Sequence, residues 1–156
     1  MCSTCKTTNR KLGLYSPLPV PSHPWESVSM DFVGVLPMTK GGNYYLYVVV
    51  DRFNKMCILM PCKKQIIAEK NVNLFFQHVW VHFGLPTSIV SDRDTQFLGD
   101  FWTRLWRMMY TKLKRSTAFH PQTYGQPEVV NQTVVLFLQG YCKKNPKVWD
   151  EQIPYV

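Results

Sequence analysis

The sequence lacks any hydrophobic run long enough to cross a membrane. Its longest purely apolar stretch, Tyr44–Val50, is far shorter than the roughly 20 residues that a transmembrane helix needs. Residues Met1 to Leu14 contain no apolar core followed by small residues, so we expect no signal peptide. Internal repeats and low-complexity tracts are also missing. A chain of 156 residues with 46% hydrophobic residues is expected to bury a core as one globular domain.

Acidic residues are scarce in this chain. It has 10 Asp and Glu against 18 Lys and Arg, which gives a formal charge of +8. This balance favours a polyanionic partner, with nucleic acid before an acidic membrane surface. The five cysteines form an odd and scattered set, which does not suggest a disulfide framework. We therefore expect a soluble protein with free thiols in a reducing compartment.

The amino-terminal segment combines two cysteines with a proline-rich connector. Cys2 and Cys5 form a lone C-x-x-C, and they are either incidental thiols or half of a zinc site, because zinc needs two further ligands. Residues 6–24 contain four of the eleven prolines and read as an extended linker. Trp25 is expected to clamp this linker to the domain.

The pattern of apolar residues predicts a mixed α/β fold. Three β-rich stretches joined by short loops predict an antiparallel meander, and two later stretches predict further strands of the same sheet. The predicted strands are Val28–Leu36, Tyr44–Val50, Met56–Met60, Ser88–Ser91 and Leu113–Ala118. Helical spacing predicts three helices: Ala68–Phe83, one around Phe101–Met109, and Gly125–Tyr141. The expected fold is a five-stranded mixed sheet flanked by helices.

Each helix at the two sides of this sheet should present an apolar stripe to the core. In the first helix the stripe comprises Ala68, Val72, Phe75, Phe76, Val79 and Phe83. In the last helix it comprises Val130, Val134, Phe137, Leu138 and Tyr141, while Glu128, Asn131, Gln132 and Gln139 occupy the other side. Gly84, with Pro86 beyond it, should end the first helix. Pro127 is expected in the first turn of the last helix, where a proline is tolerated.

Three carboxylates are candidates for a metal site. Asp31 lies within a predicted strand, Asp92 directly follows another, and Glu128 opens the last helix. Acids from such elements can converge to hold Mg²⁺ or Mn²⁺. Taken singly, Asp31 could sit at a wet sheet edge, Asp92 could cap a turn, and Glu128 could complement the helix dipole. Asp51 and Asp94 are interpreted as structural.

Polar and basic residues near these acids could contact a nucleic acid. The stretch His120–Gly125 is interpreted as a loop, which either positions a substrate or serves as an ordinary connector. Basic residues that could contact phosphates are Lys112, Lys114, Arg115, Lys143, Lys144 and Lys147. About half of these lysines and arginines are expected to be merely solvated.

Several motifs together resemble one known family. The chain is similar to the integrase catalytic core of gypsy-class LTR retrotransposons, within the retroviral integrase superfamily of ribonuclease H-like fold. The stretches that carry the resemblance are Trp25–Gly34, Val50–Lys55, Phe83–Pro86, Ser91–Phe97 and Ser116–Thr123. It implies that Asp31, Asp92 and Glu128 are the catalytic triad and bind two Mg²⁺ or Mn²⁺ ions. The implied reactions are 3′-end processing and strand transfer in DNA integration.

The resemblance also implies further contacts and partners. Nucleic-acid contacts are expected from His120, Gln122, Thr123, Asn131, Lys112, Lys114 and Arg115. The implied partners are element ends, target DNA and further copies of the chain, with no membrane. The implied location is the nucleus, entered from a cytoplasmic particle.

The same resemblance divides the chain into two parts. Residues 1–24 would be the remnant of a zinc-binding domain and its linker, and residues 25–156 a catalytic core truncated at its carboxyl end. Cys2 and Cys5 would be the last two ligands of a His-His-Cys-Cys set. Without the two histidines we do not expect bound zinc.

Two alternatives remain open at this point. Four positions depart from the family pattern: Tyr110 replaces Gly, Tyr124 replaces Asp, Pro127 replaces Thr and Val129 replaces Arg. These departures allow a catalytically inactive relic that folds and binds nucleic acid. A nuclease of the ribonuclease H or resolvase type would share the fold and the metals.

Overall fold

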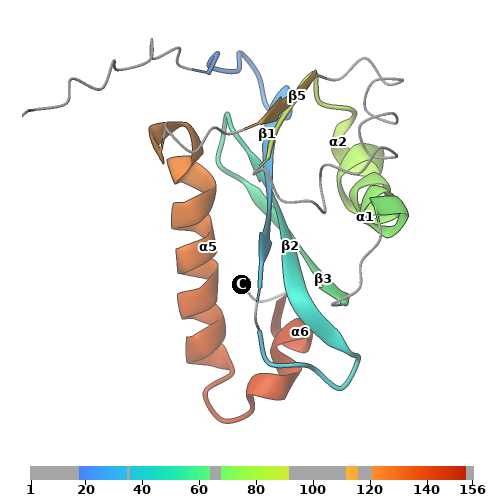
Figure 1. The fold of residues 1–156 in the computed structure, drawn as a ribbon, viewed down its shortest axis with the longest axis vertical. Coiled ribbons are helices and arrows are strands. Elements are labelled where there is room, and N and C mark those ends of the chain that lie inside the picture. Colours follow the sequence, from blue (N-terminus) through green and yellow to red (C-terminus); the bar gives the residue numbers. More distant parts are fainter. Residues whose placement is uncertain (1–17, 35, 64–67, 92–111, 116–120, 154–156) are drawn as a thin grey trace, which may run out of the picture.

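The computed structural model describes residues 18–34, 36–63, 68–91, 112–115 and 121–153. For residues 68, 69, 112–115, 121–128 and 141 it describes the backbone alone. The described strands form one mixed sheet in the order β3-β2-β1-β4-β5, with helices on both faces (Figure 1). The predicted mixed α/β fold is therefore confirmed.

The first three strands form the predicted antiparallel meander. β1 (Ser27–Val33) pairs with β2 (Asn43–Asp51), and β2 pairs with β3 (Cys57–Lys63). In this register Asp31 lies opposite Val48. The predicted first strand was too long, because β1 ends at Val33 and Gly34 lies outside it. The third strand runs further than predicted, to Lys63.

Two parallel strands continue the sheet beyond β1. β4 (Ser88–Ser91) pairs with β1, and β5 (Lys112–Arg115) pairs with β4. The parallel register sets Met30 of β1 opposite Ser91 of β4. Residues 116–118, which were predicted to extend the last strand, lie outside the described residues, as does the predicted helix around 101–109.

One face of the sheet is covered by a single continuous helical segment. It comprises α1 (Ala68–Phe75), the π-helical turn η1 (Phe76–Trp80) and α2 (Val81–Phe83). Gly84 ends the segment as predicted, with a φ of 84° that a residue with a Cβ rarely adopts. Phe75 and Val79 are buried against Val28 and Met30 of β1. Phe76 was predicted to be core but is 46% exposed, because two successive helical residues point about 100° apart.

The opposite face is covered by α5 (Pro121–Tyr141) and α6 (Trp149–Gln152). Val134 and Leu138 of α5 pack with Leu46, Val48 and Trp149 in a second core. The indole Nε1 of Trp149 donates to the Pro37 carbonyl at 2.7 Å, which fixes α6 beneath the β1–β2 connection. A short 3₁₀ turn, η2 (Pro146–Val148), joins the two helices. Phe137 was predicted to be core but is 52% exposed.

The start of α5 corrects the prediction for residues 121–128. The helix begins at Pro121, so most of the expected His120–Gly125 loop is helical. Pro127 lies beyond the first turn, where its missing N–H removes one bond of the helix ladder. Glu128 is likewise not in the first turn, which contains no acidic residue. The expected place of Glu128 in the first turn was therefore wrong, and with it the alternative interpretation of Glu128 as a partner of the helix dipole.

Candidate active site

Asp31 lies on the face of β1 that is covered by α5. Alternate residues of a strand point to opposite faces, and Val28 and Met30 belong to the core under α1. Val33 belongs to the core under α5, so Asp31 shares the α5 face. The side chain is half-buried and not at the edge of the sheet, because β2 and β4 flank β1. The wet-edge interpretation of Asp31 was therefore wrong.

Asn131 of α5 bonds directly to this carboxylate. Its Nδ2 donates to Oδ2 of Asp31 at 2.5 Å, across 100 residues of sequence. The other oxygen of Asp31, Oδ1, accepts the backbone N–H of Phe32 at 2.7 Å. Both carboxylate oxygens are thus held in place, one by the helix and one by the strand. This contact fixes the height of α5 along β1.

Two residues next to Asp31, Asn131 and Ser29, each carry a buried oxygen atom. Oδ1 of Asn131 is buried and has no hydrogen-bond partner among the described residues. The same is true of Oγ of Ser29, which is two residues before Asp31 on the same face of β1. A buried acceptor without a partner costs about 1–3 kcal/mol. Carboxylate and amide oxygens are the ligands that Mg²⁺ takes, so the described atoms fit a hard divalent cation.

The side chains of the other two predicted acids, Asp92 and Glu128, are not described. Asp92 lies outside the described residues, but it directly follows Ser91, which pairs with the residue before Asp31. Glu128 is in α5, three residues before Asn131, and its side chain is not described. Residues three apart are neighbours on a helix surface. In the described part of the chain, three His, Cys, Asp or Glu side chains never gather as a metal-binding group.

Of the predicted nucleic-acid contacts, only the side chain of Asn131 is described. Lys112, Lys114 and Arg115 form β5, and Gln122 and Thr123 belong to the first turns of α5, but only their backbones are described. His120 lies outside the described residues. The role of Asn131 as the partner of Asp31 was missed. Asn131 was predicted on the side of the helix away from the core, whereas its amide faces β1 and bonds to Asp31 across 100 residues, a contact that no local pattern indicates.

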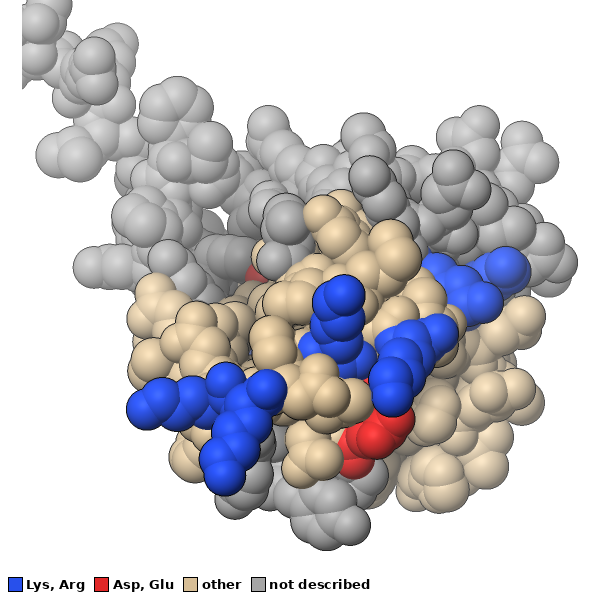
Figure 2. All heavy atoms as spheres, turned by 90° about the horizontal axis from the view of Figure 1, so that it is seen from below, with Lys and Arg blue, Asp and Glu red and all other residues tan. Residues whose placement is uncertain are grey.

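Basic side chains gather at the end of the molecule where α5 ends. Lys143, Lys144 and Lys147 follow α5 and are exposed, as is Lys40 in the β1–β2 turn. Figure 2 shows Lys and Arg side chains over much of this end, with a smaller acidic patch. Such a surface attracts phosphate backbones with little regard to sequence. Among the described residues, no helix is both long and apolar enough to cross a bilayer.

Trp25, which was predicted to clamp the preceding segment to the domain, packs against the end of the helical segment. The Trp25 ring is buried and stacks on Phe83, with 4.0 Å between ring centroids and 17° between planes. Its backbone N–H donates to Oδ1 of Asp51 at 3.1 Å, although its φ of 62° is unusual for a residue with a side chain. Arg52 also donates to Oγ of Ser27, at 2.9 Å. Cys2 and Cys5 lie outside the described residues.

The cysteines that the structure describes are free thiols. Cys57, Cys62 and Cys142 form no disulfide, which confirms the prediction for these three positions. Burial raises the pKa of each thiol, and that of Cys62 reaches about 12. A raised pKa keeps the thiol protonated and unreactive at neutral pH. These cysteines are therefore packing residues rather than nucleophiles.

Comparison with known protein families identifies a matching domain model. Residues 21–121 match the family described as Integrase core domain. The matched range includes Asp31 and Asp92 and stops before Glu128. The chain is also 42% identical over 159 aligned residues to the Transposon Tf2-3 and Tf2-4 polyproteins of Schizosaccharomyces pombe. That alignment covers 99% of this chain and 12% of each polyprotein, so the chain spans about an eighth of these relatives.

Solved structures with a similar fold come from retroviral integrases. The HTLV-2 integrase catalytic core domain in complex with magnesium, in its dimeric form, aligns with a TM-score of 0.65 and 21% identity. That alignment covers 85% of this chain and 83% of the other. A chain of the simian T-cell lymphotropic virus intasome in complex with PP2A regulatory subunit B56 gamma aligns with a TM-score of 0.66 and 20% identity. It covers 79% of this chain and 43% of the other.

Proposed function

Because the chain belongs to the Integrase core domain family, we propose that it is the catalytic core of a retrotransposon integrase. The proposed reactions are hydrolytic trimming of a DNA 3′ end and joining of that end to target DNA. The observation that carries the proposal is the Asp31 carboxylate, half-buried on the α5 face and bonded by Asn131. We also propose that the complete core has the five-stranded ribonuclease H-like sheet, with β5 as its fifth strand.

Three acids would hold the metal ions in this proposal. Asp31, Asp92 and Glu128 would bind two Mg²⁺ or Mn²⁺ ions, and such ions would supply activation of the attacking oxygen and stabilisation of the leaving oxygen at phosphorus. The HTLV-2 core, which has a similar fold, was solved in complex with magnesium. The support within this chain is the pairing of Met30 with Ser91, since each of these residues directly precedes one of the acids.

Asn131 and the backbone of Phe32 would orient the carboxylate of Asp31. The Asn131 amide and the Phe32 N–H each hold one carboxylate oxygen, so the side chain cannot rotate freely. Groups that position a metal ligand in this manner are typically worth 10- to 100-fold in affinity or activity. Asn131 would therefore act as a positioning residue, in addition to any contact with DNA.

The proposal is tested with an end-processed DNA duplex and Mn²⁺. The wild-type chain should nick the duplex or join its end to a second duplex, and Asp92→Asn should abolish both reactions because the substitution removes a carboxylate charge. Asp150→Asn is the matched control, since Asp150 lies in α6 and accepts from Asn43 instead of facing the site. Activity that survives Asp92→Asn would refute the mechanism. Nicking without joining would favour a nuclease of the ribonuclease H or resolvase type.

A second candidate function is nucleic-acid binding without chemistry. The exposed lysines after α5 favour it, because they are separate from Asp31 and need no metal. This candidate predicts DNA binding that depends on salt, is unchanged by Asp92→Asn, and is accompanied by no strand cleavage with Mn²⁺. A DNA partner, assembly into oligomers and a nuclear site of action are part of the first proposal.

A further inference from the structure

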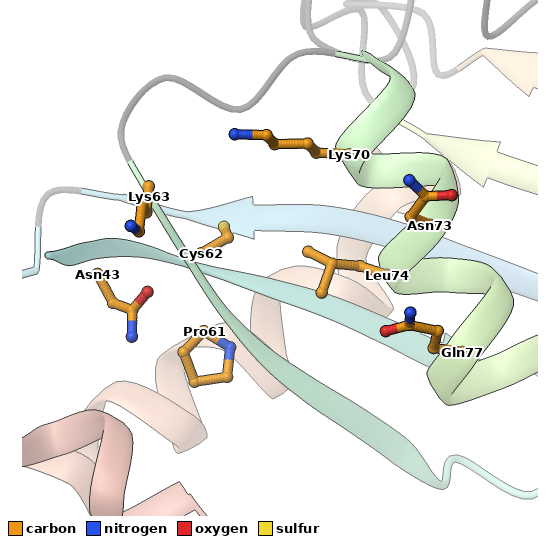
Figure 3. Close-up of a pocket in the computed structure, with 8 residues that line it drawn as sticks. All are labelled: Asn43, Pro61, Cys62, Lys63, Lys70, Asn73, Leu74 and Gln77. Carbon is orange, nitrogen blue, oxygen red and sulfur yellow. The ribbon is translucent and has the colours of Figure 1, made fainter. Parts of the chain in front are cut away.

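A pocket lies on the opposite side of the sheet from the face that carries Asp31. It has a volume of about 320 Å³ and opens between β3 and the helical segment α1–η1 (Figure 3). The strands contribute Asn43, Pro61, Cys62 and Lys63, and the helix contributes Lys70, Asn73, Leu74 and Gln77. This volume is at the small end of the range for ligand pockets in proteins.

The rim of the pocket is basic and rich in hydrogen-bond donors. Lys63 and Lys70 are exposed, and neither forms an ion pair with any described residue. Figure 3 shows Lys70 extending from α1 toward the strand that carries Lys63. Asn73 and Gln77 are one helical turn apart, and each has an exposed amide that can donate two hydrogen bonds. The rim can therefore surround an anion that has several acceptor oxygens.

The floor of the pocket is apolar and uncharged. Leu74 is half-buried and points toward Pro61 and Cys62. The Cys62 thiol donates to the Tyr45 carbonyl at 3.4 Å, and burial raises its pKa to about 12, so it stays neutral at physiological pH. Asp150 accepts from Nδ2 of Asn43 at 2.8 Å and is not part of the lining. The lining itself therefore carries two positive charges and no negative charge.

We propose that this pocket binds a phosphate monoester. A phosphate monoester carries close to two negative charges at pH 7, which matches two lysines, whereas a carboxylate or a phosphodiester carries one. The apolar floor would contact the organic group attached to the phosphate. Two sources share this chemistry: a free nucleoside monophosphate and the terminal phosphate of a nucleic-acid strand. The site is independent of the proposed strand transfer, because it uses none of the three acids and requires no divalent metal.

Calorimetric titration of the full chain with AMP, without divalent metal, tests the proposal. Saturable binding to one site is expected, with a Kd of about 1 mM or tighter, while adenosine without phosphate should not bind. Lys63→Gln and Lys70→Gln should each weaken binding about tenfold, because each removes a charged hydrogen-bond donor. Lys55→Gln makes the same charge change outside the pocket, in the exposed turn between β2 and β3, and should leave the Kd within about twofold. Asp31→Asn should also leave it unchanged, which separates this result from the fate of the proposed function.

Two further ligands distinguish the sources of phosphate. Tighter binding of a 5′-phosphorylated oligonucleotide than of its 5′-hydroxyl form, lost in the Lys63→Gln, Lys70→Gln double variant, would identify a strand end. Binding of AMP with no such difference would identify a free nucleotide. The proposal is overturned if AMP does not bind, if adenosine binds equally well, or if the double variant binds AMP as the wild type does. Both lysines are exposed, so the variants should fold, and their thermal unfolding provides the check.

Discussion

The buried carboxylate of Asp51 holds the turn after β2 and the backbone at Trp25 in place. It is fully buried at the end of β2 and accepts backbone N–H groups from Trp25, Phe53 and Asn54 at 3.1, 3.1 and 3.4 Å. It therefore satisfies donors in two segments that are far apart in sequence. This confirms the interpretation of Asp51 as structural, which was made because an acid at a strand end often bonds turn backbone.

At the residue scale, we predict that Asp51→Ala strongly destabilises the domain. The substitution leaves three N–H groups without their acceptor; the bond from Trp25 is buried and those from Phe53 and Asn54 are part-buried, and a buried group left unpaired costs about 1–3 kcal/mol. We expect a loss of about 3 kcal/mol or more in the free energy of unfolding, measured by urea denaturation followed through tryptophan fluorescence. Asp150→Ala, which removes one half-buried bond to Asn43, should cost about 1 kcal/mol or less. Equal losses in the two variants would contradict the role given to Asp51.

At the scale of elements, α5 connects the core to the candidate active site. One side of the helix buries Val134 and Leu138, while Asn131, one turn earlier, reaches Asp31. The outer side exposes Leu136 and Phe137, at 68% and 52%. The position of the candidate metal site therefore depends on how well this helix packs against β1 and β2.

Two leucines of α5, two residues apart, should respond very differently to truncation. Leu138 is 4% exposed and Leu136 is 68% exposed. Leu138→Ala opens a cavity and should cost about 2–5 kcal/mol in unfolding free energy. Leu136→Ala should change it by no more than about 0.5 kcal/mol. Thermal or urea unfolding of both variants gives the comparison, and a cost for Leu136→Ala as large as that for Leu138→Ala would show that α5 is packed differently.

The elements differ in how far the sequence predicts them. β2 was predicted to within a residue or so at each end because its run of valines and tyrosines is bounded by turn residues, and the helix end at Gly84 carried its own signal. The start of α5 was missed because Pro121, Gly125 and Pro127 favour a loop locally. Proline is nevertheless acceptable at a first helical position. The Asn131–Asp31 bond spans 100 residues and has no local signature.

At the scale of the whole molecule, the exposed lysines and the candidate metal site occupy different regions. Asp31 lies between β1 and α5, while exposed lysines extend over the end where α5 terminates. A net charge of +8 supports association with a polyanion but does not identify it. Because the two regions are separate, DNA binding and catalysis can be tested independently. The sequence alone could not show this separation, because distance along the chain does not determine distance in the fold.

Replacement of Lys143, Lys144 and Lys147 by Gln should reduce the salt dependence of DNA binding. Each phosphate contact contributes about −0.9 to the slope of log K against log salt, so the slope should become less steep by up to about 3. Fluorescence anisotropy with a labelled duplex at several salt concentrations measures it. Lys55→Gln, in the exposed turn between β2 and β3, should change the slope by about 1 or less. An unchanged slope in the triple variant would place the DNA elsewhere.

The central claim is that Asp31 belongs to a divalent-metal site between β1 and α5. The most direct test is a Mn²⁺ titration of the full chain, followed by loss of the electron paramagnetic resonance signal of unbound Mn²⁺. We predict that Asp31→Asn weakens Mn²⁺ binding at least about tenfold, because it removes one charged oxygen ligand. The matched variant Asp150→Asn should bind as the wild type does. Equal Mn²⁺ affinity in the wild type and in Asp31→Asn would contradict the claim.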